Sequence, residues 1–382
     1  MRVLRNEENE LVASFKEKLL LLMPLQFSRF NGIHNLYADL VTGLEKIGIK
    51  SELIEIKMQD RAKSEFEPNF PVRRVGLDDI QDVLQSDVPK LTIDDFQLIW
   101  SFSHIPIKPR KLLIWAQYFY GHRFIFTQYR QWQDEKTLDG RIKNLMAGLT
   151  PSVIANSLAK RYISTLRGSH LVAQSLWTCL LLNRTYNLNC NGVVYLPVDP
   201  FYYNVAPEVT HNKNVLIYFG GPLDTNLDQL KHTTLILSEA LPSVRFMGFG
   251  NQETAKTWSK TNNIEVDFYP SVSRAELSGL FARSMITVCP IYNGNFEKVP
   301  IESLLNGTPV ISYEQPFKEV TGESTLIANI QNDSEVKRKI GIWSGNDIVN
   351  QKEEMKERIL SIMDHQNVAR GIIMAMNDHI IQ

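Results

Sequence analysis

The stretch 288–312, VCPIYNGNFEKVPIESLLNGTPVIS, constrains the fold most, because it reads as a strand end, a loop, a helix, a turn and a strand in succession. The apolar run 285–289 is typical of a buried strand. Pro300 suits the first turn of a helix, Gly307 suits the residue just after a helix, and 309–313 predicts the next strand. The stretch therefore predicts a βαβ unit with a loop at the carboxyl end of its first strand, where open α/β sheets bind ligands.

We expect Glu302 to lie within the first turn of this helix. A carboxylate there can accept two hydrogen bonds from a vicinal diol, as the acidic residue of dinucleotide sites does with ribose. Free N–H groups at the helix start suit a phosphate. The spacing leaves a second interpretation open, in which Glu302 only stabilises its helix terminus.

The same residues resemble the signature of the retaining glycosyltransferases of family 4, roughly E-x-F-G-x-P-x-x-E-A-x-A-x-G-x-P-V-I. Phe296 matches the Phe, Glu302 matches the second Glu, and 307–311 match the closing turn and strand. Two residues of the pattern are missing: Gly294 stands in place of its first Glu, and Glu297 stands in place of its Gly. The resemblance implies a GT-B fold, with two doubly wound Rossmann-like domains facing a cleft, and a ribose contact from Glu302.

Alternating strand-like and helical runs predict an α/β chain with two doubly wound parallel sheets. Strands are expected at 18–25, 51–56, 94–102, 112–116, 123–127, 168–175, 214–221, 244–250, 264–269 and 326–330. Helices are expected at 34–47, 176–183, 228–240, 274–283 and 352–378, and 59–88 is expected to be a polar surface excursion. We assign the first domain to 1–198, with a terminal helix at about 362–382 packing back on it, and the second to 199–361.

Composition excludes several classes of protein. The chain has 382 residues and a net charge of −1, so no overall positive field draws it to nucleic acid. The N-terminus is too acidic for a signal peptide, and no apolar run approaches the length of a membrane span. Cys179, Cys190 and Cys289 show neither metal-binding nor pairing spacing. We expect buried free thiols, no metal site and a cytoplasmic protein.

In the first domain, Gly32 follows the first strand. The resemblance implies a loop there whose backbone approaches the donor diphosphate, although a purely structural turn explains one glycine as well. In many family members a histidine aimed at the donor sugar follows a later strand, and here Gln128 and Tyr129 occupy that place. His104, which also follows a strand, is a candidate substitute, and an ordinary loop histidine is the alternative.

In the second domain, Gly220 and Gly221 follow a strand, in the tract where the family carries an arginine and a lysine for the diphosphate. Those two positions hold Gly221 and Asn226. Backbone N–H groups could bind phosphate instead, with Lys298 as the cation, unless Lys298 is simply solvated. The loop residues expected to line the sugar-phosphate side are Asn295, Phe296, Glu297 and Lys298.

The region 140–198 contains no aspartate or glutamate. Within it, 152–166 can form an amphipathic helix in which Arg161 flanks the apolar face and Lys160 lies roughly opposite it. Such a helix can lie on an anionic bilayer, and it can equally be a core-facing helix with solvated charges. The basic residues of the region are Arg141, Lys143, Lys160, Arg161, Arg167 and Arg184.

The predicted function is transfer of a sugar from a UDP- or GDP-sugar to an acceptor, a growing glycan or a polyisoprenoid-phosphate-linked one at the inner membrane face. The resemblance implies retention of configuration without a metal or other cofactor, and closure about a hinge at 197–207. The missing family residues also allow a catalytically impaired subunit that binds a protein or lipid partner. An epimerase or phosphorylase is disfavoured, because neither motif is present.

Overall fold

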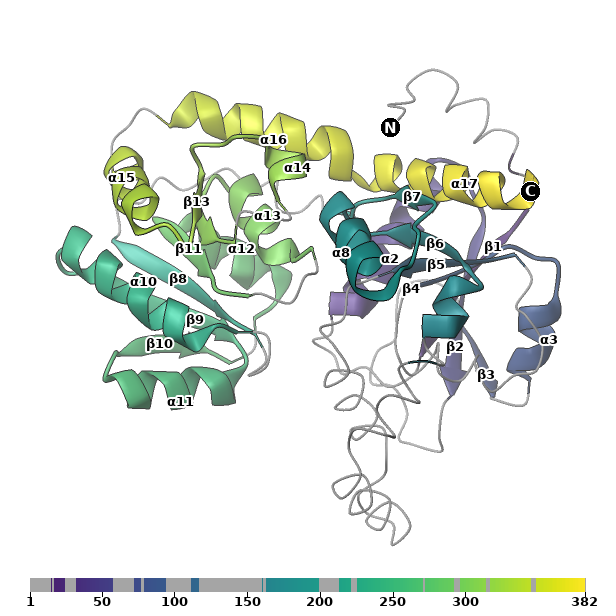
Figure 1. Ribbon diagram of the computed structural model, residues 1–382, viewed down its shortest axis with the longest axis horizontal. Coiled ribbons are helices and arrows are strands. Elements are labelled where there is room, and N and C mark those ends of the chain that lie inside the picture. Colours follow the sequence, from purple (N-terminus) through teal and green to yellow (C-terminus); the bar gives the residue numbers. More distant parts are fainter. Residues whose placement is uncertain are drawn as a thin grey trace, which may run out of the picture. The chain divides into compact units, whose positions relative to one another are not determined.

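The computed structural model describes residues 15, 17–24, 32–57, 72–76, 79–93, 111–116, 160, 163–198, 213–220, 225–270, 272–291, 296–313, 317–344 and 348–381. The chain forms two compact units, one made of Met1–Tyr195 with Gln366–Gln382 and the other of Leu196–His365. Each unit is built on a parallel β-sheet with helices packed against it (Figure 1).

The first unit holds a seven-stranded parallel sheet in the order β3-β2-β1-β4-β5-β6-β7. Its strands are β1 (Leu19–Pro24), β2 (Ser51–Lys57), β3 (Val72–Gly76), β4 (Lys90–Ile93), β5 (Leu112–Ala116), β6 (His170–Ala173) and β7 (Gly192–Val193). Its principal helices are α2 (Gly32–Lys46), α3 (Ile80–Gln85), α8 (Leu176–Tyr186) and most of α17 (His365–Ile381). The strand order reverses between β1 and β4, as in doubly wound folds.

Apolar runs on the central strands make the core of this unit. Every residue of β5 is buried, and the indole N–H of Trp115 donates to the backbone oxygen of Val194 at 2.8 Å. The Tyr37 hydroxyl of α2 donates to the backbone oxygen of Leu22 on β1. A Cβ added at Gly371 of α17 would lie 3.3 Å from Val194, so the glycine lets this helix approach the segment after β7.

The edge strand β3 was missed by the sequence analysis. Arg74 pairs with the buried Glu55 at 2.9 Å, and Arg73 pairs with Glu52 at 3.3 Å, both across to β2. The prediction of a polar surface excursion at 59–88 was therefore wrong for 72–76 and 80–85, which form the sheet strand β3 and the helix α3. β4 was missed as well, since it begins at Lys90. The predicted strands at 94–102 and 123–127 lie outside the described residues.

The second unit holds a six-stranded parallel sheet in the order β10-β9-β8-β11-β12-β13. Its strands are β8 (Asn214–Phe219), β9 (Arg245–Gly250), β10 (Val266–Tyr269), β11 (Ile286–Cys289), β12 (Val310–Ser312) and β13 (Ile327–Asn329). Its helices are α10 (Leu227–Ala240), α11 (Gln252–Asn262), α12 (Arg274–Ala282), α13 (Lys298–Leu305), α14 (Lys318–Thr321), α15 (Asp333–Trp343) and α16 (Val349–Met363).

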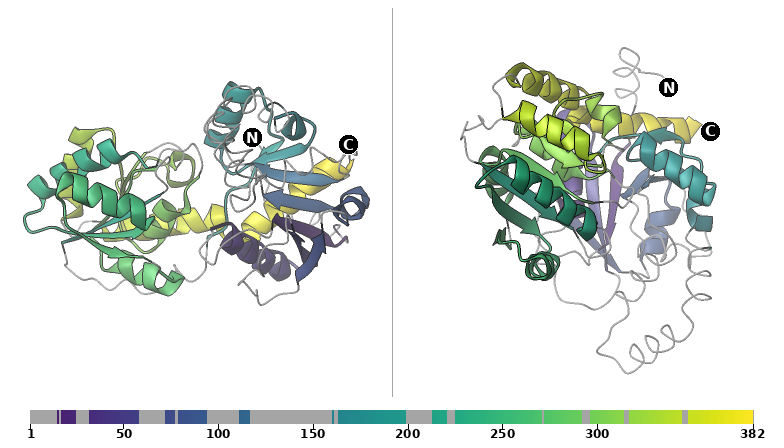
Figure 2. Two further views of the ribbon diagram at one scale, coloured as in Figure 1. Left: turned by 90° about the horizontal axis from the view of Figure 1, so that it is seen from below. Right: turned by 60° about the vertical axis from the view of Figure 1, so that its left-hand side comes forward.

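Right-handed crossovers place α10 and α11 on one face of this sheet and α12 and α13 on the other (Figure 1, Figure 2). The helix α10 packs beside α15, and α13 packs beside α12 and α16. The strand order reverses between β8 and β11. The predicted fold class, α/β with two doubly wound parallel sheets, is confirmed.

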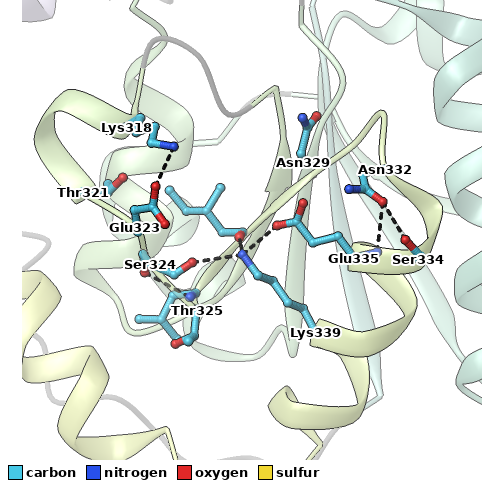
Figure 3. Close-up of polar contacts among 12 residues, drawn as sticks. Lys318, Thr321, Glu323, Ser324, Thr325, Asn329, Asn332, Ser334, Glu335 and Lys339 are labelled. Carbon is cyan, nitrogen blue, oxygen red and sulfur yellow. Dashed lines mark hydrogen bonds and ion pairs between the residues drawn. The ribbon is translucent and has the colours of Figure 1, made fainter.

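A buried lysine joins α15 to the sheet edge of this unit (Figure 3). The Lys339 ammonium donates to the backbone oxygen of Ser324 at 3.0 Å and to that of Ile327, and it pairs with Glu335 at 2.8 Å. These contacts satisfy an ammonium that is almost completely removed from water. The charge is therefore part of how α15 packs on β13.

Replacing Lys339 with methionine is expected to destabilise the second unit by about 2–3 kcal/mol, because two carbonyls and a carboxylate lose their partner. The matched control is Lys337→Met on the same helix, whose lysine pairs with Glu239 on the exposed surface at 3.5 Å. That change should stay within about 0.5 kcal/mol. Chemical denaturation followed by circular dichroism compares the two, and equal effects would contradict the role assigned to Lys339.

Candidate functional site

The carboxyl edge of the second sheet has a switch point between β8 and β11, the place where doubly wound sheets bind ligands. Gly220 directly follows β8, and Ile291 follows β11 by two residues. An antiparallel bridge between Thr225 and Ile291 joins the two connections. The sequence analysis placed its main candidates in these connections.

Gly220 packs against the Ile291 side chain of the connection after β11. A Cβ there would lie 2.5 Å from Cδ1 of Ile291 and 3.2 Å from Oγ1 of Thr225. A larger residue would require the Ile291 side chain to move. Its neighbour Gly221 lies outside the described residues, so the predicted phosphate contact of this pair stays a prediction.

The helix α13 begins at Lys298, two residues earlier than Pro300 suggested, although Pro300 does lie in its first turn. Glu302 follows Lys298 by four residues and so lies in the second turn, and the first turn holds no acidic residue. The prediction of a first-turn Glu302 was wrong. The influence of a helix dipole falls off within the first turn, so the alternative role of Glu302 as a helix-end stabiliser loses its basis.

Glu302 is nearly buried, with 8% of the residue exposed, and its Oε1 lies 3.9 Å from Nζ of Lys298. The Lys298 side chain is itself only 17% exposed. A lysine at the first position of a helix sits at the positive end of the helix dipole, which disfavours it. A nearly buried carboxylate one turn away offsets that cost, and an anion arriving at the helix start would do so too.

Phe296 and Glu297 lead into α13 with different roles. Phe296 is 2% exposed, and its ring packs edge-on against the ring of Phe317, with the two ring centroids 5.4 Å apart. The Phe296 side chain therefore anchors the loop in the core. Glu297 occupies the N-cap position of α13 without a side-chain cap hydrogen bond. Burial, and then the negative charge of Glu297, raise the pKa of Cys289 at the end of β11. Cys289 therefore stays a neutral thiol and is no nucleophile.

Asn226, which stands where the family carries a lysine, ties three connections together. Its Oδ1 accepts from the backbone N–H of Gln229 at 3.1 Å and caps α10, and its Nδ2 donates to the Tyr313 hydroxyl at 2.8 Å. Its backbone N–H donates to the oxygen of Pro290 at 2.9 Å. Asn226 thus links the ends of β8, β11 and β12. The sequence analysis placed Tyr313 inside the predicted strand 309–313 and missed its role, whereas Tyr313 directly follows β12.

The candidates of the first unit are only partly described. Gly32 is the first residue of α2 rather than a loop residue, so a helix start, not a free glycine loop, stands at this position. His104 and Tyr129 lie outside the described residues, as does Asn295 of the second unit. Among the described candidates, Gly220 lies in the connection after β8, and Phe296, Glu297, Lys298 and Glu302 lie in the connection after the neighbouring strand β11.

A second surface feature lies in the first unit, around the end of α8. A hollow of about 520 Å³ is lined by Lys160, Arg167 and Arg184 with Ile163 and Tyr186. Arg167 donates to the backbone oxygen of Tyr186 at 3.2 Å. No ion pair to a carboxylate is found for these three cations among the described residues.

By sequence, no protein family profile and no curated protein matches this chain. By structure, it matches a sucrose-phosphate synthase from Thermosynechococcus elongatus with a TM-score of 0.69 and 12% identity, over 96% of this chain and 100% of that one. A variant of TarM from S. aureus, solved in complex with fondaparinux, alpha-GlcNAc-glycerol and UDP, matches with a TM-score of 0.64 and 8% identity. This match covers 94% of this chain and 100% of that one. The E. coli structure described as trehalose-6-phosphate bound with UDP-2-fluoro glucose matches with a TM-score of 0.64 and 10% identity. This match covers 94% of this chain and 98% of that one.

These neighbours are GT-B glycosyltransferases, and the match runs over both parallel sheets. The chain has the GT-B fold. Within this GT-B chain, α13 and the connections after β8, β11 and β12 belong to the second unit. Membership of glycosyltransferase family 4 stays a prediction.

Proposed function

We propose that this GT-B chain is a glycosyltransferase that moves a sugar from a UDP- or GDP-sugar to an acceptor hydroxyl or phosphate. The observation that carries the proposal is the nearly buried Glu302 with Lys298 one turn away, on the helix that follows β11 at the switch point. Two structural neighbours were solved with UDP or a UDP-sugar, which supports a nucleotide-sugar donor.

The donor binds α13 through two parts of its nucleotide. The Glu302 carboxylate accepts hydrogen bonds from both ribose hydroxyls, a pairing that a diol and a carboxylate make well. Lys298 and the free N–H groups of the first turn of α13 meet the diphosphate. Lys298 and Glu302 are four residues apart, and their charged ends lie 3.9 Å from one another, so adjacent parts of one nucleotide can meet both side chains.

Catalysis then rests on charge stabilisation and orientation. As the bond from the sugar to the diphosphate breaks, negative charge grows on the leaving diphosphate, and Lys298 with the helix start stabilises it. No metal ion takes part in this scheme, and the configuration at the sugar is retained. His104 and Tyr129 stay candidates for contact with the sugar. Exclusion of water protects the donor from hydrolysis.

Calorimetric titration with UDP and with GDP tests the proposal. We expect one of them to bind in the micromolar range, about −8 kcal/mol. The preferred base then selects the donor sugars to screen, and NMR of the product shows whether the anomeric configuration is retained. A folded protein that binds neither nucleotide would refute the donor site and favour the alternative, a subunit that binds a protein or lipid partner.

We further propose a polyisoprenoid-phosphate-linked acceptor, met at the anionic inner face of the membrane. On α8, Leu176 and Leu180 are 39% and 41% exposed, and with the exposed Arg184 they share one helix face. The carboxyl end of α8, which includes Arg184, carries the basic hollow, and 140–198 holds no acidic residue. Leucines beside arginines suit the interface of an anionic bilayer. None of the described helices combines the length and apolar character of a membrane span.

Sedimentation with anionic vesicles at low salt checks this surface. The wild type should bind them, and Arg184→Gln should bind roughly fivefold more weakly, since each basic residue near such a surface contributes about 1 kcal/mol. The control Lys337→Gln removes an exposed cation from the other unit and should bind as the wild type does. Equal binding to neutral vesicles, or none to anionic ones, would contradict the proposal.

A further inference from the structure

The basic hollow of the first unit lies at the amino edge of its sheet. The helical residues 163–167 end just before β6, and α8 ends before the chain enters β7. Because these strands are parallel, both helix ends lie at the edge opposite to the one where doubly wound sheets bind ligands. A ligand in this hollow is therefore separate from any ligand bound at the carboxyl edge of the unit.

Three cations reach the hollow from two elements. Lys160, Ile163 and Arg167 are helical and spaced i, i+3 and i+7, so they share one face of a helix. Leu166 of the same segment is completely buried, so another side of this helix packs in the core. Arg184 comes from the last turn of α8. The two elements thus present three exposed positive charges to one hollow.

A hydrogen bond fixes Arg167 where the two elements meet. Its Nη2 donates to the backbone oxygen of Tyr186, the last residue of α8, at 3.2 Å. A guanidinium has five N–H donors in a planar fork, so this bond orients Arg167 and leaves other donors for an anion. Part of the hollow is therefore organised before a ligand arrives, which lowers the entropic cost of binding.

Arg184 is not needed to complete the end of α8. A cation in the last turn ordinarily complements the helix dipole, and this is the simplest alternative role for Arg184. The backbone already caps the helix, however, because the N–H of Asn187 donates to the oxygens of Asn183 and Leu182. Within the described part of the chain, the Arg184 guanidinium makes neither a hydrogen bond nor an ion pair. It therefore has all its donors to offer to a ligand.

The positive charge of the hollow is not balanced locally. No aspartate or glutamate occurs in 140–198, and the described residues that line the hollow include no carboxylate. Like charges around one hollow repel each other, and an anion between them relieves that repulsion. A phosphate monoester carries about two negative charges at neutral pH and accepts paired hydrogen bonds from arginine.

We propose that the basic hollow binds a phosphate monoester or diphosphate group through Arg167, Arg184 and Lys160. Ile163 and Tyr186 line the same hollow and would pack against an apolar or ring part of the compound. The volume of about 520 Å³ falls within the range of small-molecule sites, roughly 300–1,000 Å³. The group belongs to a free phosphorylated metabolite or to a phospholipid head group. Its place at the amino edge makes this a regulatory or anchoring site that does not depend on the proposed sugar transfer.

Calorimetric titration of the full-length protein with inorganic pyrophosphate at low salt tests the site. We expect binding that Arg184→Gln weakens about tenfold or more, the loss expected for one charged hydrogen-bonding partner. The matched control Lys46→Gln removes the exposed last-turn cation of α2 in the same unit and should leave this binding unchanged. Lys298→Gln alters the proposed donor site of the other unit and should also leave it unchanged, so failures of the two sites are distinguishable.

A vesicle experiment distinguishes the two sources of the phosphate. Phosphatidic acid carries a phosphate monoester, whereas phosphatidylglycerol carries only a diester, and the two kinds of vesicle are matched in surface charge. Tighter binding to phosphatidic acid, reversed by pyrophosphate, would assign a lipid head group to the hollow. Pyrophosphate binding without a preference between the vesicles would assign a free phosphorylated metabolite.

Three results would overturn the proposal. One is the absence of pyrophosphate binding up to millimolar concentration. Another is an equal loss in Arg184→Gln and Lys46→Gln, which would indicate a diffuse effect of net charge. The third is loss of all pyrophosphate binding in Lys298→Gln, which would place the anion in the second unit. Slower amide exchange at 184–188 of the wild type with pyrophosphate is the expected result of a second measurement that needs no variant.

Discussion

Replacing Glu302 with alanine is expected to weaken nucleotide binding roughly 30- to 700-fold, which corresponds to about 2–4 kcal/mol. The loss is large because the carboxylate accepts two charge-assisted hydrogen bonds from the ribose in the proposed complex. Its place on α13, nearly buried and beside Lys298, keeps it oriented before the donor arrives. Calorimetric titration of wild type and variant with the preferred nucleotide measures the change.

Glu302→Gln is the matched control for this prediction. The amide keeps the shape of the side chain and one acceptor oxygen but loses the charge, so its affinity should lie between those of the wild type and Glu302→Ala. Thermal unfolding of both variants separates loss of contact from loss of fold, since Lys298 loses its carboxylate partner in each. If the alanine variant is folded and binds the nucleotide as tightly as the wild type does, Glu302 does not contact the ribose.

Replacing Gly250 with alanine is expected to destabilise the second unit by at least about 3 kcal/mol. Gly250 ends β9 with a φ of +102°, a conformation that other residues rarely adopt. A Cβ would also lie 2.2 Å from the backbone oxygen of Phe219, which already accepts from the N–H of Asn251 at 2.7 Å. Neither strand can move aside without breaking the pairing of β8 with β9. Denaturant unfolding followed by circular dichroism measures the loss.

Gly279→Ala on α12 supplies a control of opposite sign. A Cβ there meets nothing within 4 Å, and alanine is a better helix former than glycine. This change should stabilise the unit by about 0.5–1 kcal/mol. If Gly250→Ala were as stable as the wild type, the backbone strain and the clash assigned to β9 would both be refuted.

Much of the second unit could be predicted from sequence, because its strands are short apolar runs ended by glycine or polar residues. The helix α13 is the instructive exception. The pattern correctly placed Pro300 in the first turn but left Lys298 in the loop before it, whereas the helix begins at Lys298 after Glu297, which makes no side-chain cap. A boundary set by how the loop packs, here through Phe296 on Phe317, leaves no local mark in the sequence.

The first unit was harder to predict, for physical reasons. β3 reads Val-Arg-Arg-Val-Gly, and its arginines face acidic partners on β2 rather than a core, so it shows no apolar alternation. β4 starts with the buried Lys90, a residue type that argues against a buried strand.

The strand β3 has a consequence for how the protein behaves in concentrated solution. An edge strand offers unpaired backbone groups to any other extended chain, and this is how sheets join into aggregates. Charged side chains on β3, engaged with Glu52 and Glu55, resist such an addition, because a new strand would have to displace or desolvate them. At the opposite edge, β7 spans only Gly192–Val193, too short a template for another strand. Charged side chains at one edge of the sheet and a very short strand at the other thus both disfavour self-association through strand addition.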